Sequence, residues 1–168
     1  VAGRKESKKR TEEFAKRIGA SRAFTDYEEL LKMPNIEIIS VCAPNYLHEQ
    51  IAVAAAEHGK HIIVEKPIAR TTKQAESMVS AARKANVKLM YAENFQYAPS
   101  FVKAEEIASQ GGIGEIFMAT AREAHSGPHS RWFYELSLAG GGALIDLGIH
   151  DIQLLRMYTK SYPKDVSA

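Results

Sequence analysis

The sequence predicts an α/β protein built on a parallel sheet. Short apolar runs rich in β-branched residues recur along the first half of the chain, at Ile36–Pro44, His61–Val64 and Val87–Tyr91. Helical segments of about a dozen residues lie between them, and glycine or proline ends most segments. Strands that alternate with helices of this length are typical of βαβ units, in which neighbouring strands run parallel.

The elements up to the first strand follow from local patterns. Phe14 and Ile18 lie four residues apart among charged residues, which predicts an amphipathic helix over 7–19. The segment Asp26-Tyr-Glu-Glu-Leu-Leu predicts a short capped helix. The run at 36–44 is mainly apolar and predicts a strand buried on both faces, as parallel sheets usually have.

The later elements repeat the same alternation. Helices are predicted at Leu47–His58 and, with a threonine cap, at Thr72–Asn86, so the rhythm is Rossmann-like. Such folds carry a Gly-x-Gly-x-x-Gly turn after the first strand, and this sequence contains none. Val1–Arg4 has the character of the end of a second strand. We therefore expect the first strand and the main phosphate site to lie upstream, and this chain alone to bind a dinucleotide poorly.

The pattern changes after Asn94. Pro99–Ser109 is predicted to be helical, and Glu115–Arg122 resembles the opening strand of a different sheet. An irregular segment rich in His, Trp, Tyr and Pro then leads to Gly140–Tyr158, a helical pattern that opens with three glycines. We expect residues 1–97 to form a partial dinucleotide-binding domain and residues 98–168 to begin an α+β domain.

Composition narrows the classes of partner. The chain has 168 residues with a formal net charge of +2, and no Lys/Arg run is interleaved with aromatic residues, which argues against nucleic acid. No apolar stretch approaches the roughly 20 residues that cross a bilayer. The single cysteine, Cys42, is expected to be a small core residue in a reducing cytoplasm. A lost targeting segment stays open, because the chain begins with Val.

Two motifs could carry chemistry. Lys66, in Glu65-Lys66-Pro67, follows an apolar strand, where ligands of open α/β sheets bind, so its ammonium could stabilise charge on a substrate oxygen. The alternative is a solvated lysine before a loop proline. Asp146 and His150 have the i,i+4 spacing of one helix face, so the carboxylate could orient a general-base imidazole. The alternative is a pair of surface neighbours.

Both motifs together resemble the Gfo/Idh/MocA family, which contains glucose-fructose oxidoreductase and inositol dehydrogenase. The run Ser40–Pro67 is similar to the second half of that family's Rossmann domain, and Gly140–Ile152 is similar to a motif of its substrate domain. The helix that begins at Asp26 and the segment Ala92-Glu-Asn-Phe fall in matching places, so the resemblance covers nearly the whole chain.

The resemblance implies an NAD(P)-dependent dehydrogenase or reductase acting on CH–OH groups of a sugar, inositol or related polyol. Lys66, Asp146 and His150 match the family's catalytic set, with His150 taking the hydroxyl proton and Lys66 assisting the oxygen charge. Residues 98–168 would begin its substrate-binding and oligomerisation domain, and the full-length protein would form a homo-oligomer. Two other readings stay open: a non-catalytic dinucleotide-binding regulatory protein, and a relative that uses NAD transiently for elimination.

The resemblance also implies cofactor contacts. These would come from Ala43, Pro44, Asn45, His48, Glu65, Lys66 and Asn94. Asn45 could instead cap the next helix, and His48 could be a surface residue. Arg4 stands where NAD enzymes carry an acidic residue, which favours NADP over NAD unless Arg4 merely begins a basic helix.

The resemblance further implies that the segment His125–Tyr134, called the aromatic loop, would line the substrate pocket. Trp132 offers an apolar face for stacking on a sugar or cyclic polyol, or it could pack at the domain junction. His125 and His129 lack a carboxylate or thiolate partner on a clear scaffold, so we expect no metal.

Overall fold

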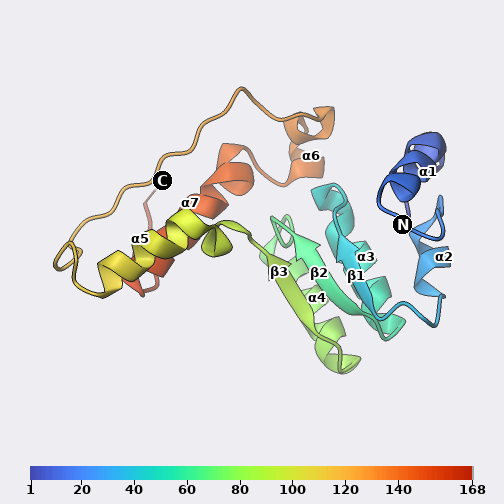
Figure 1. The fold of residues 1–168 in the computed structure, drawn as a ribbon, viewed down its shortest axis with the longest axis horizontal. Helices are drawn as coiled ribbons and strands as arrows, with labels where there is room; N and C mark the ends of the chain where they lie inside the picture. Colours follow the sequence, from blue (N-terminus) through green and yellow to red (C-terminus); the bar gives the residue numbers. More distant parts are fainter. Residues whose placement is uncertain (168) are drawn as a thin grey trace. The chain divides into compact units, whose positions relative to one another are not determined.

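The computed structural model describes residues 1–167, which fall into two compact units (Figure 1). The first comprises Val1–Ala43, Leu47–Glu65 and Thr71–Tyr91. The second comprises Pro44–Tyr46, Lys66–Arg70 and the chain from Ala92 onward.

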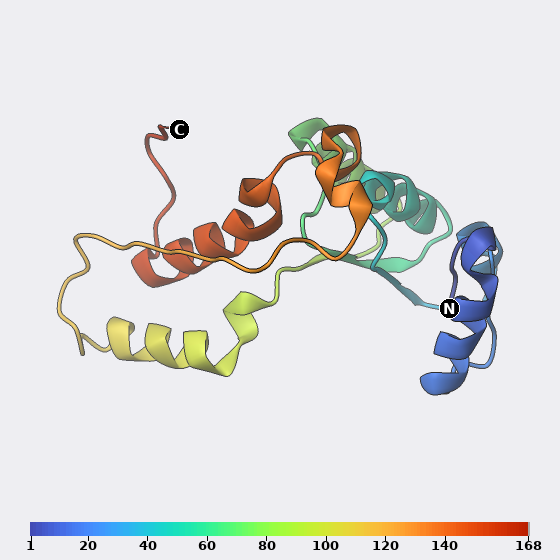
Figure 2. The same cartoon turned by 90° about the horizontal axis from the view of Figure 1, so that it is seen from above.

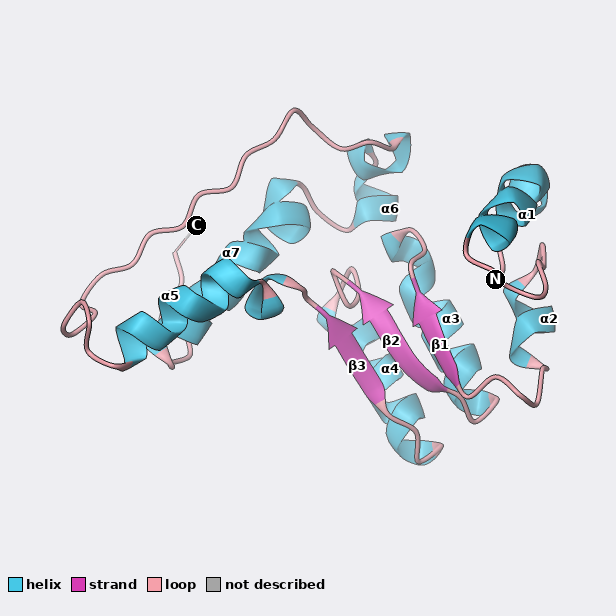
Figure 3. Ribbon diagram, viewed as in Figure 1, coloured by secondary structure: helices cyan, strands magenta, loops and turns pink. Residues whose placement is uncertain are grey.

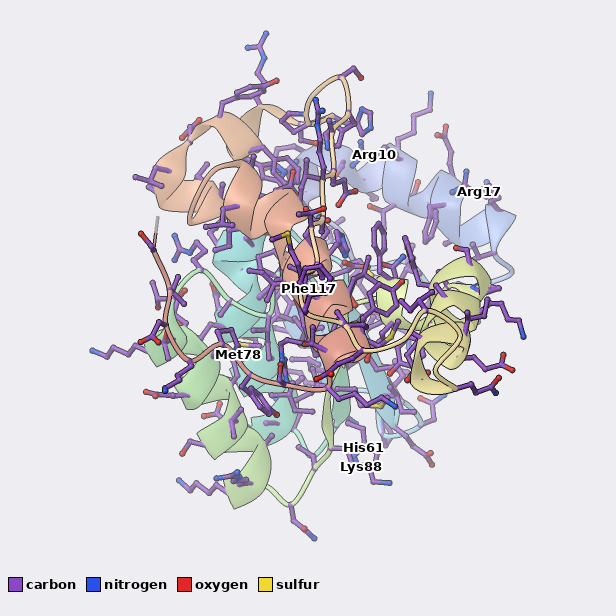
Figure 4. All side chains as sticks on the ribbon, turned by 90° about the vertical axis from the view of Figure 1, so that its left-hand side faces the viewer. Arg10, Arg17, His61, Met78, Lys88 and Phe117 are labelled. Atoms are coloured by element: carbon purple, nitrogen blue, oxygen red, sulfur yellow. The ribbon has the colours of Figure 1, made fainter. Side chains whose placement is uncertain are left out.

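The first unit is built on a three-stranded sheet in the order β1 (Ile38–Val41), β2 (His61–Glu65) and β3 (Leu89–Ala92). β1 and β2 are parallel, with Ile38 opposite His61, and the three arrows in Figure 3 point the same way. The main-chain N–H of Lys88 donates to Nδ1 of His61 at 3.1 Å, and the two residues lie together in Figure 4. The predicted parallel α/β sheet is confirmed.

Two helices, α3 (His48–Glu57) and α4 (Thr72–Lys84), cover the same face of this sheet, as Figure 2 shows from above. α3 turns a row of alanines inward, and their small side chains let α4 pack closely against it. As predicted, a threonine caps α4, because the Thr71 hydroxyl accepts the N–H of Gln74 at 3.3 Å. The buried core of the sheet and these helices comprises Ile39, Val41, Ile51, Ala52, Ala55, Ala56, Ile62, Val64, Met78 and Ala82.

The prediction that the first strand is buried on both faces is wrong. Ile39 and Val41 are buried, whereas Ile38 on the opposite face is 55% exposed. The expectation that Cys42 is a core residue is also wrong, since its side chain is exposed. Both differences have one cause: α3 and α4 lie on a single face of the sheet (Figure 2), where α3 contacts β1 and β2, and neither α1 nor α2 contacts a strand.

The N-terminal segment contains two helices, α1 (Lys8–Arg17) and α2 (Tyr27–Leu31). The Asp26 carboxylate accepts the N–H of Glu28 at 2.9 Å, which confirms the predicted cap. Before α1, Ala2 forms an isolated parallel bridge with Phe24, so a strand-like pairing does involve the first residues.

The second unit contains α5 (Pro99–Ser109), α6 (Leu136–Ala139) and α7 (Ile149–Thr159). α5 and α7 pack side by side, and a π-helical turn, η5 (Leu144–Gly148), leads directly into α7. The short 3-10 helices of this unit are η2 (Asn45–Leu47, of which Leu47 falls in the first unit), η3 (Phe95–Tyr97) and η4 (Arg131–Tyr134).

The strand predicted at Glu115–Arg122 is absent from the described residues. The segment is extended, but no neighbouring segment forms a ladder with it, and a strand requires such hydrogen bonds. Phe117, labelled in Figure 4, is consequently 94% exposed. Within residues 1–167, every helix is too short or too polar to cross a membrane.

Candidate active site

The candidate site is assembled from the loops that follow the three strands. The residues after β1, Pro44–Tyr46, those after β2, Lys66–Arg70, and those after β3 from Ala92 onward all belong to the second unit. The carboxyl ends of parallel strands meet at one edge of a sheet, where open α/β proteins bind their ligands. Three loops that are far apart in the sequence therefore belong to one compact unit, together with α5, α6 and α7.

Lys66 forms an ion pair with Asp146. Its Nζ donates to Oδ1 of Asp146 at 2.8 Å and to the main-chain oxygen of the same residue at 2.7 Å. The two side chains are 21% and 16% exposed, so the pair is mostly buried but reaches solvent. The peptide bond between Lys66 and Pro67 is cis. The structure thus brings together two of the residues that the sequence selected 80 positions apart.

His150 forms a second ion pair, with Glu93. The imidazole Nδ1 lies 2.5 Å from Oε1 of Glu93, and the side chains are 6% and 0% exposed. The Phe95 ring stacks on the imidazole with centroids 4.1 Å apart and planes at 17°. His150 is therefore held by residues that directly follow β3.

The inference that Asp146 orients His150 is wrong. Asp146 lies in the π-helical turn η5 and pairs with Lys66, whereas His150 lies in α7 and pairs with Glu93. A π-helical turn contains an extra residue, so spacing rules for an α-helix do not carry across it. Sequence reasoning missed Glu93 as a site residue, although its position just after a predicted strand was a usable signal.

Polar contacts also hold the loops after β1 and β2 against α6. The buried amide of Asn45 donates to the Ala139 oxygen at 2.9 Å, and Arg70 Nη1 donates to the Ser137 oxygen. Gly140 ends α6 with φ +88°, and a Cβ placed on it would lie 2.5 Å from Cβ of Arg70. Glycine is required here for two reasons: the left-handed backbone and the close approach of Arg70.

The remaining predicted cofactor residues differ in exposure. His48 is buried and its Nε2 donates to the Ala43 oxygen at 2.8 Å, so it shapes its own loop. Arg4 and Asn94 are exposed, and Glu65 is half-buried.

The ring contacts of the aromatic loop are between its own residues. Trp132 is half-buried and stacks on Phe133, with centroids 3.7 Å apart. The His125 and His129 rings stack at 6.5 Å, and no cluster of three metal-ligating side chains occurs among the described residues.

Comparison with protein families finds two adjacent matches. A family described as oxidoreductases with an NAD-binding Rossmann fold matches residues 3–93. The GFO/IDH/MocA C-terminal domain matches residues 101–168.

The chain is similar to several curated dehydrogenases. It is 38% identical over 149 residues to levoglucosan dehydrogenase of Pseudarthrobacter phenanthrenivorans, covering 86% of this chain and 38% of that protein. It is 34% identical over 159 residues to D-glucoside 3-dehydrogenase of Escherichia coli, covering 92% and 45%. The chain therefore spans less than half the length of these relatives.

The chain is also similar in structure to solved oxidoreductases. Levoglucosan dehydrogenase in complex with NADH and levoglucosan has a TM-score of 0.78 at 33% identity, covering 94% of this chain and 44% of that one. Aldose-aldose oxidoreductase from Caulobacter crescentus complexed with glycerol has a TM-score of 0.79 at 26% identity, covering 97% and 49%.

Proposed function

The chain belongs to the Gfo/Idh/MocA family of oxidoreductases, whose N-terminal domain is an NAD-binding Rossmann fold, and from this premise we propose that it is part of an NAD(P)-dependent oxidoreductase. The reaction is hydride exchange at a hydroxyl-bearing carbon of a sugar, inositol or related polyol. The observation that carries the proposal is the ion pair between Lys66 and Asp146, which the fold builds from segments 80 positions apart. Dehydrogenases of levoglucosan and D-glucosides among the relatives support the substrate class.

We propose Lys66, Asp146 and His150 as the catalytic residues. In the oxidative direction His150 accepts the proton of the substrate hydroxyl, and Lys66 stabilises the negative charge that develops on that oxygen. Asp146 holds the Lys66 ammonium in place through Oδ1 and the main-chain oxygen. In the reductive direction His150 returns the proton.

A nicotinamide dinucleotide, when bound, exchanges hydride with the substrate carbon. The exposed amide of Asn94 and the half-buried carboxylate of Glu65, both next to strand ends, fit contacts to the sugar part of such a molecule. Ala43 and Pro44 provide a loop wall, which Asn45 and His48 fix through their main-chain hydrogen bonds. Lys66 adds positive charge at the same loops.

We propose NADP over NAD because Arg4 is exposed and suits a 2′-phosphate. NADH is the cofactor in the related levoglucosan dehydrogenase complex, so a direct comparison of the two cofactors decides this point.

We propose that the domain boundary lies between residues 97 and 98. The family matches at 3–93 and 101–168 support this position. Trp132 is the proposed stacking surface for the sugar ring. A cytoplasmic homo-oligomer without nucleic-acid or membrane partners is the proposed form of the full-length protein, in keeping with one cysteine and a net charge of +2.

The test is the absorbance change at 340 nm of the full-length protein with NAD or NADP and a panel of levoglucosan, glucosides and myo-inositol. We expect a cofactor-dependent change with at least one sugar, and its loss in Lys66→Ala. Tight cofactor binding without turnover on any polyol would contradict the proposal and favour a regulatory protein. Substrate elimination without net accumulation of reduced cofactor would favour the transient use of NAD.

A further inference from the structure

We infer that Glu93 is a positioning residue that sets the tautomer and orientation of His150 for proton transfer, an inference that rests on the proposed function. Two carboxylates, of Asp146 and Glu93, lie near the start of α7, and the structure assigns only that of Glu93 to the imidazole of His150. Glu93 Oε1 lies 2.5 Å from Nδ1 of His150, whereas Asp146 pairs with Lys66.

The hydrogen bonds of Glu93 fix the direction of its bond to His150. Its Oε1 accepts the N–H of Phe95 at 3.0 Å, and its Oε2 accepts the N–H of Gln96 at 3.4 Å. A carboxylate that accepts main-chain hydrogen bonds on both oxygens acts as an acceptor, so Nδ1 is the donor. The neutral imidazole then carries its lone pair on Nε2, which is the atom that accepts the substrate proton.

The ring is also held in plane. Phe95 stacks on one face of the imidazole, and Gln153 Nε2 donates to the Gln96 side-chain oxygen at 3.3 Å, one turn along α7 from His150. The Gln96 amide in turn donates to the Glu93 main-chain oxygen at 3.0 Å. The segment Glu93–Gln96 therefore contacts α7 at two successive turns, at His150 and at Gln153. Rotation of the His150 side chain would break its contacts with both Glu93 and Phe95.

The charge balance of the step gives Glu93 an electrostatic role as well. In oxidation the O–H bond of the substrate breaks and an N–H bond forms at Nε2, while the C–H pair leaves as hydride to an oxidised nicotinamide. The electron pair of the O–H bond becomes part of the new carbonyl group, and the imidazole becomes a cation. A buried carboxylate bonded to Nδ1 stabilises that cation without taking the proton itself, as in other carboxylate–imidazole pairs.

Two variants of the full-length protein test this role. Glu93→Gln keeps the size of the side chain but removes the charge and permits the opposite hydrogen-bond direction. We expect kcat to fall about 10²- to 10⁴-fold, the range that a positioned general base typically contributes, with little change in KM. Glu93→Asp retains the carboxylate and is expected to recover part of the loss. The matched control is Glu105→Gln, which removes a half-buried carboxylate that pairs with the exposed Lys160 in the same unit and is expected to leave kcat unchanged.

A second readout does not depend on turnover. Nitrogen-15 spectra of histidine-labelled protein, with the His150 signals assigned by His150→Gln, report which ring nitrogen carries the proton. We expect protonated Nδ1 and bare Nε2 in the wild type, and a mixture of tautomers in Glu93→Gln. A bare Nδ1 in the wild type, or an unchanged kcat in a folded Glu93→Gln, overturns the inference.

The two failures are distinguishable. If the wild type turns over no substrate, the proposed function fails, while the nitrogen spectra still decide whether Glu93 sets the tautomer. If Glu93→Gln does not fold, the wild-type spectra and the activity of Glu93→Asp carry the test.

Discussion

The two ion pairs of the site join neighbouring parts of the same unit, but they differ in their access to solvent. Lys66 and Asp146 keep about a fifth of their side-chain surface exposed, whereas Glu93 and His150 are almost completely enclosed. An accessible ammonium can contact a ligand, while an enclosed carboxylate can act only through the group beside it. This difference agrees with the proposed roles, in which Lys66 contacts the substrate and Glu93 acts through His150.

Apart from the Glu93 variants, the largest effect on kcat is expected from Lys66→Ala. Removal of a charge that stabilises a developing oxyanion typically lowers kcat by about 10²- to 10³-fold. Lys66→Arg keeps the charge but not the compact ammonium that fits two oxygens of Asp146, so we expect most of the loss to remain. Steady-state kinetics of the full-length protein measure both variants. Wild-type kcat in Lys66→Ala would remove Lys66 from the catalytic set.

The buried pair is expected to contribute more to stability than the accessible one. Glu93→Ala removes the partner of His150 and the acceptor of two main-chain N–H groups, and we expect a loss of about 3 kcal/mol in the free energy of unfolding. Asp146→Ala leaves a lysine that solvent can reach, so about 2 kcal/mol is expected. Urea unfolding of both variants measures the difference. A larger loss in Asp146→Ala than in Glu93→Ala would reverse the comparison.

The turn that precedes Asp146 is expected to tolerate no side chain at one glycine. Gly140→Ala places a Cβ against Arg70 at a positive φ, and about 1–3 kcal/mol of stability should be lost. Gly142→Ala is the matched control, because nothing lies within 4 Å of its Cβ and its φ is not positive. Thermal unfolding of the two variants side by side checks this. Equal melting temperatures would show that the turn adapts freely.

The smallest effect is expected from an exposed surface pair. Lys103 and Glu106 lie 2.8 Å apart on α5 with both side chains largely exposed. Lys103→Ala should change the free energy of unfolding by less than about 0.5 kcal/mol, because solvent screens such pairs. The same urea titration measures it, and an effect as large as that of Asp146→Ala would mean that exposure does not rank these pairs.

Local patterns in the sequence were sufficient for the elements of the first half. Caps at Asp26 and Thr71 and the apolar strands all have local causes, so the predicted order of helices and strands matches the structure. Burial was harder to predict, because Cys42 and Ile38 depend on whether a second layer covers that face of the sheet. The strand expected at 115–122 failed for a related reason: strand formation needs a partner, which local pattern does not reveal.

The sequence predicted which residues belong to the candidate site better than it predicted which of them form pairs. Strand ends and motif spacing selected Lys66, Asp146 and His150, and the Lys66–Asp146 contact agrees with that selection. Their catalytic roles stay predictions. The partner of His150 could not be read from helical spacing, because the π-helical turn shifts the register between Asp146 and α7. The position of Glu93 after a predicted strand marked it as a candidate, but its pairing with His150, 57 residues further along, needed three-dimensional information.

The hydrogen bonds of the three strand-end loops have a consequence for how the chain folds. Asn45, Lys66 and Arg70 each depend on a partner between 67 and 94 residues further along. Contacts of such long range form late, because the intervening chain must first lose its freedom. On a ribosome, the parallel strands can therefore assemble before these loops have anything to bind. We expect the site to be the last part of this chain to become ordered during synthesis.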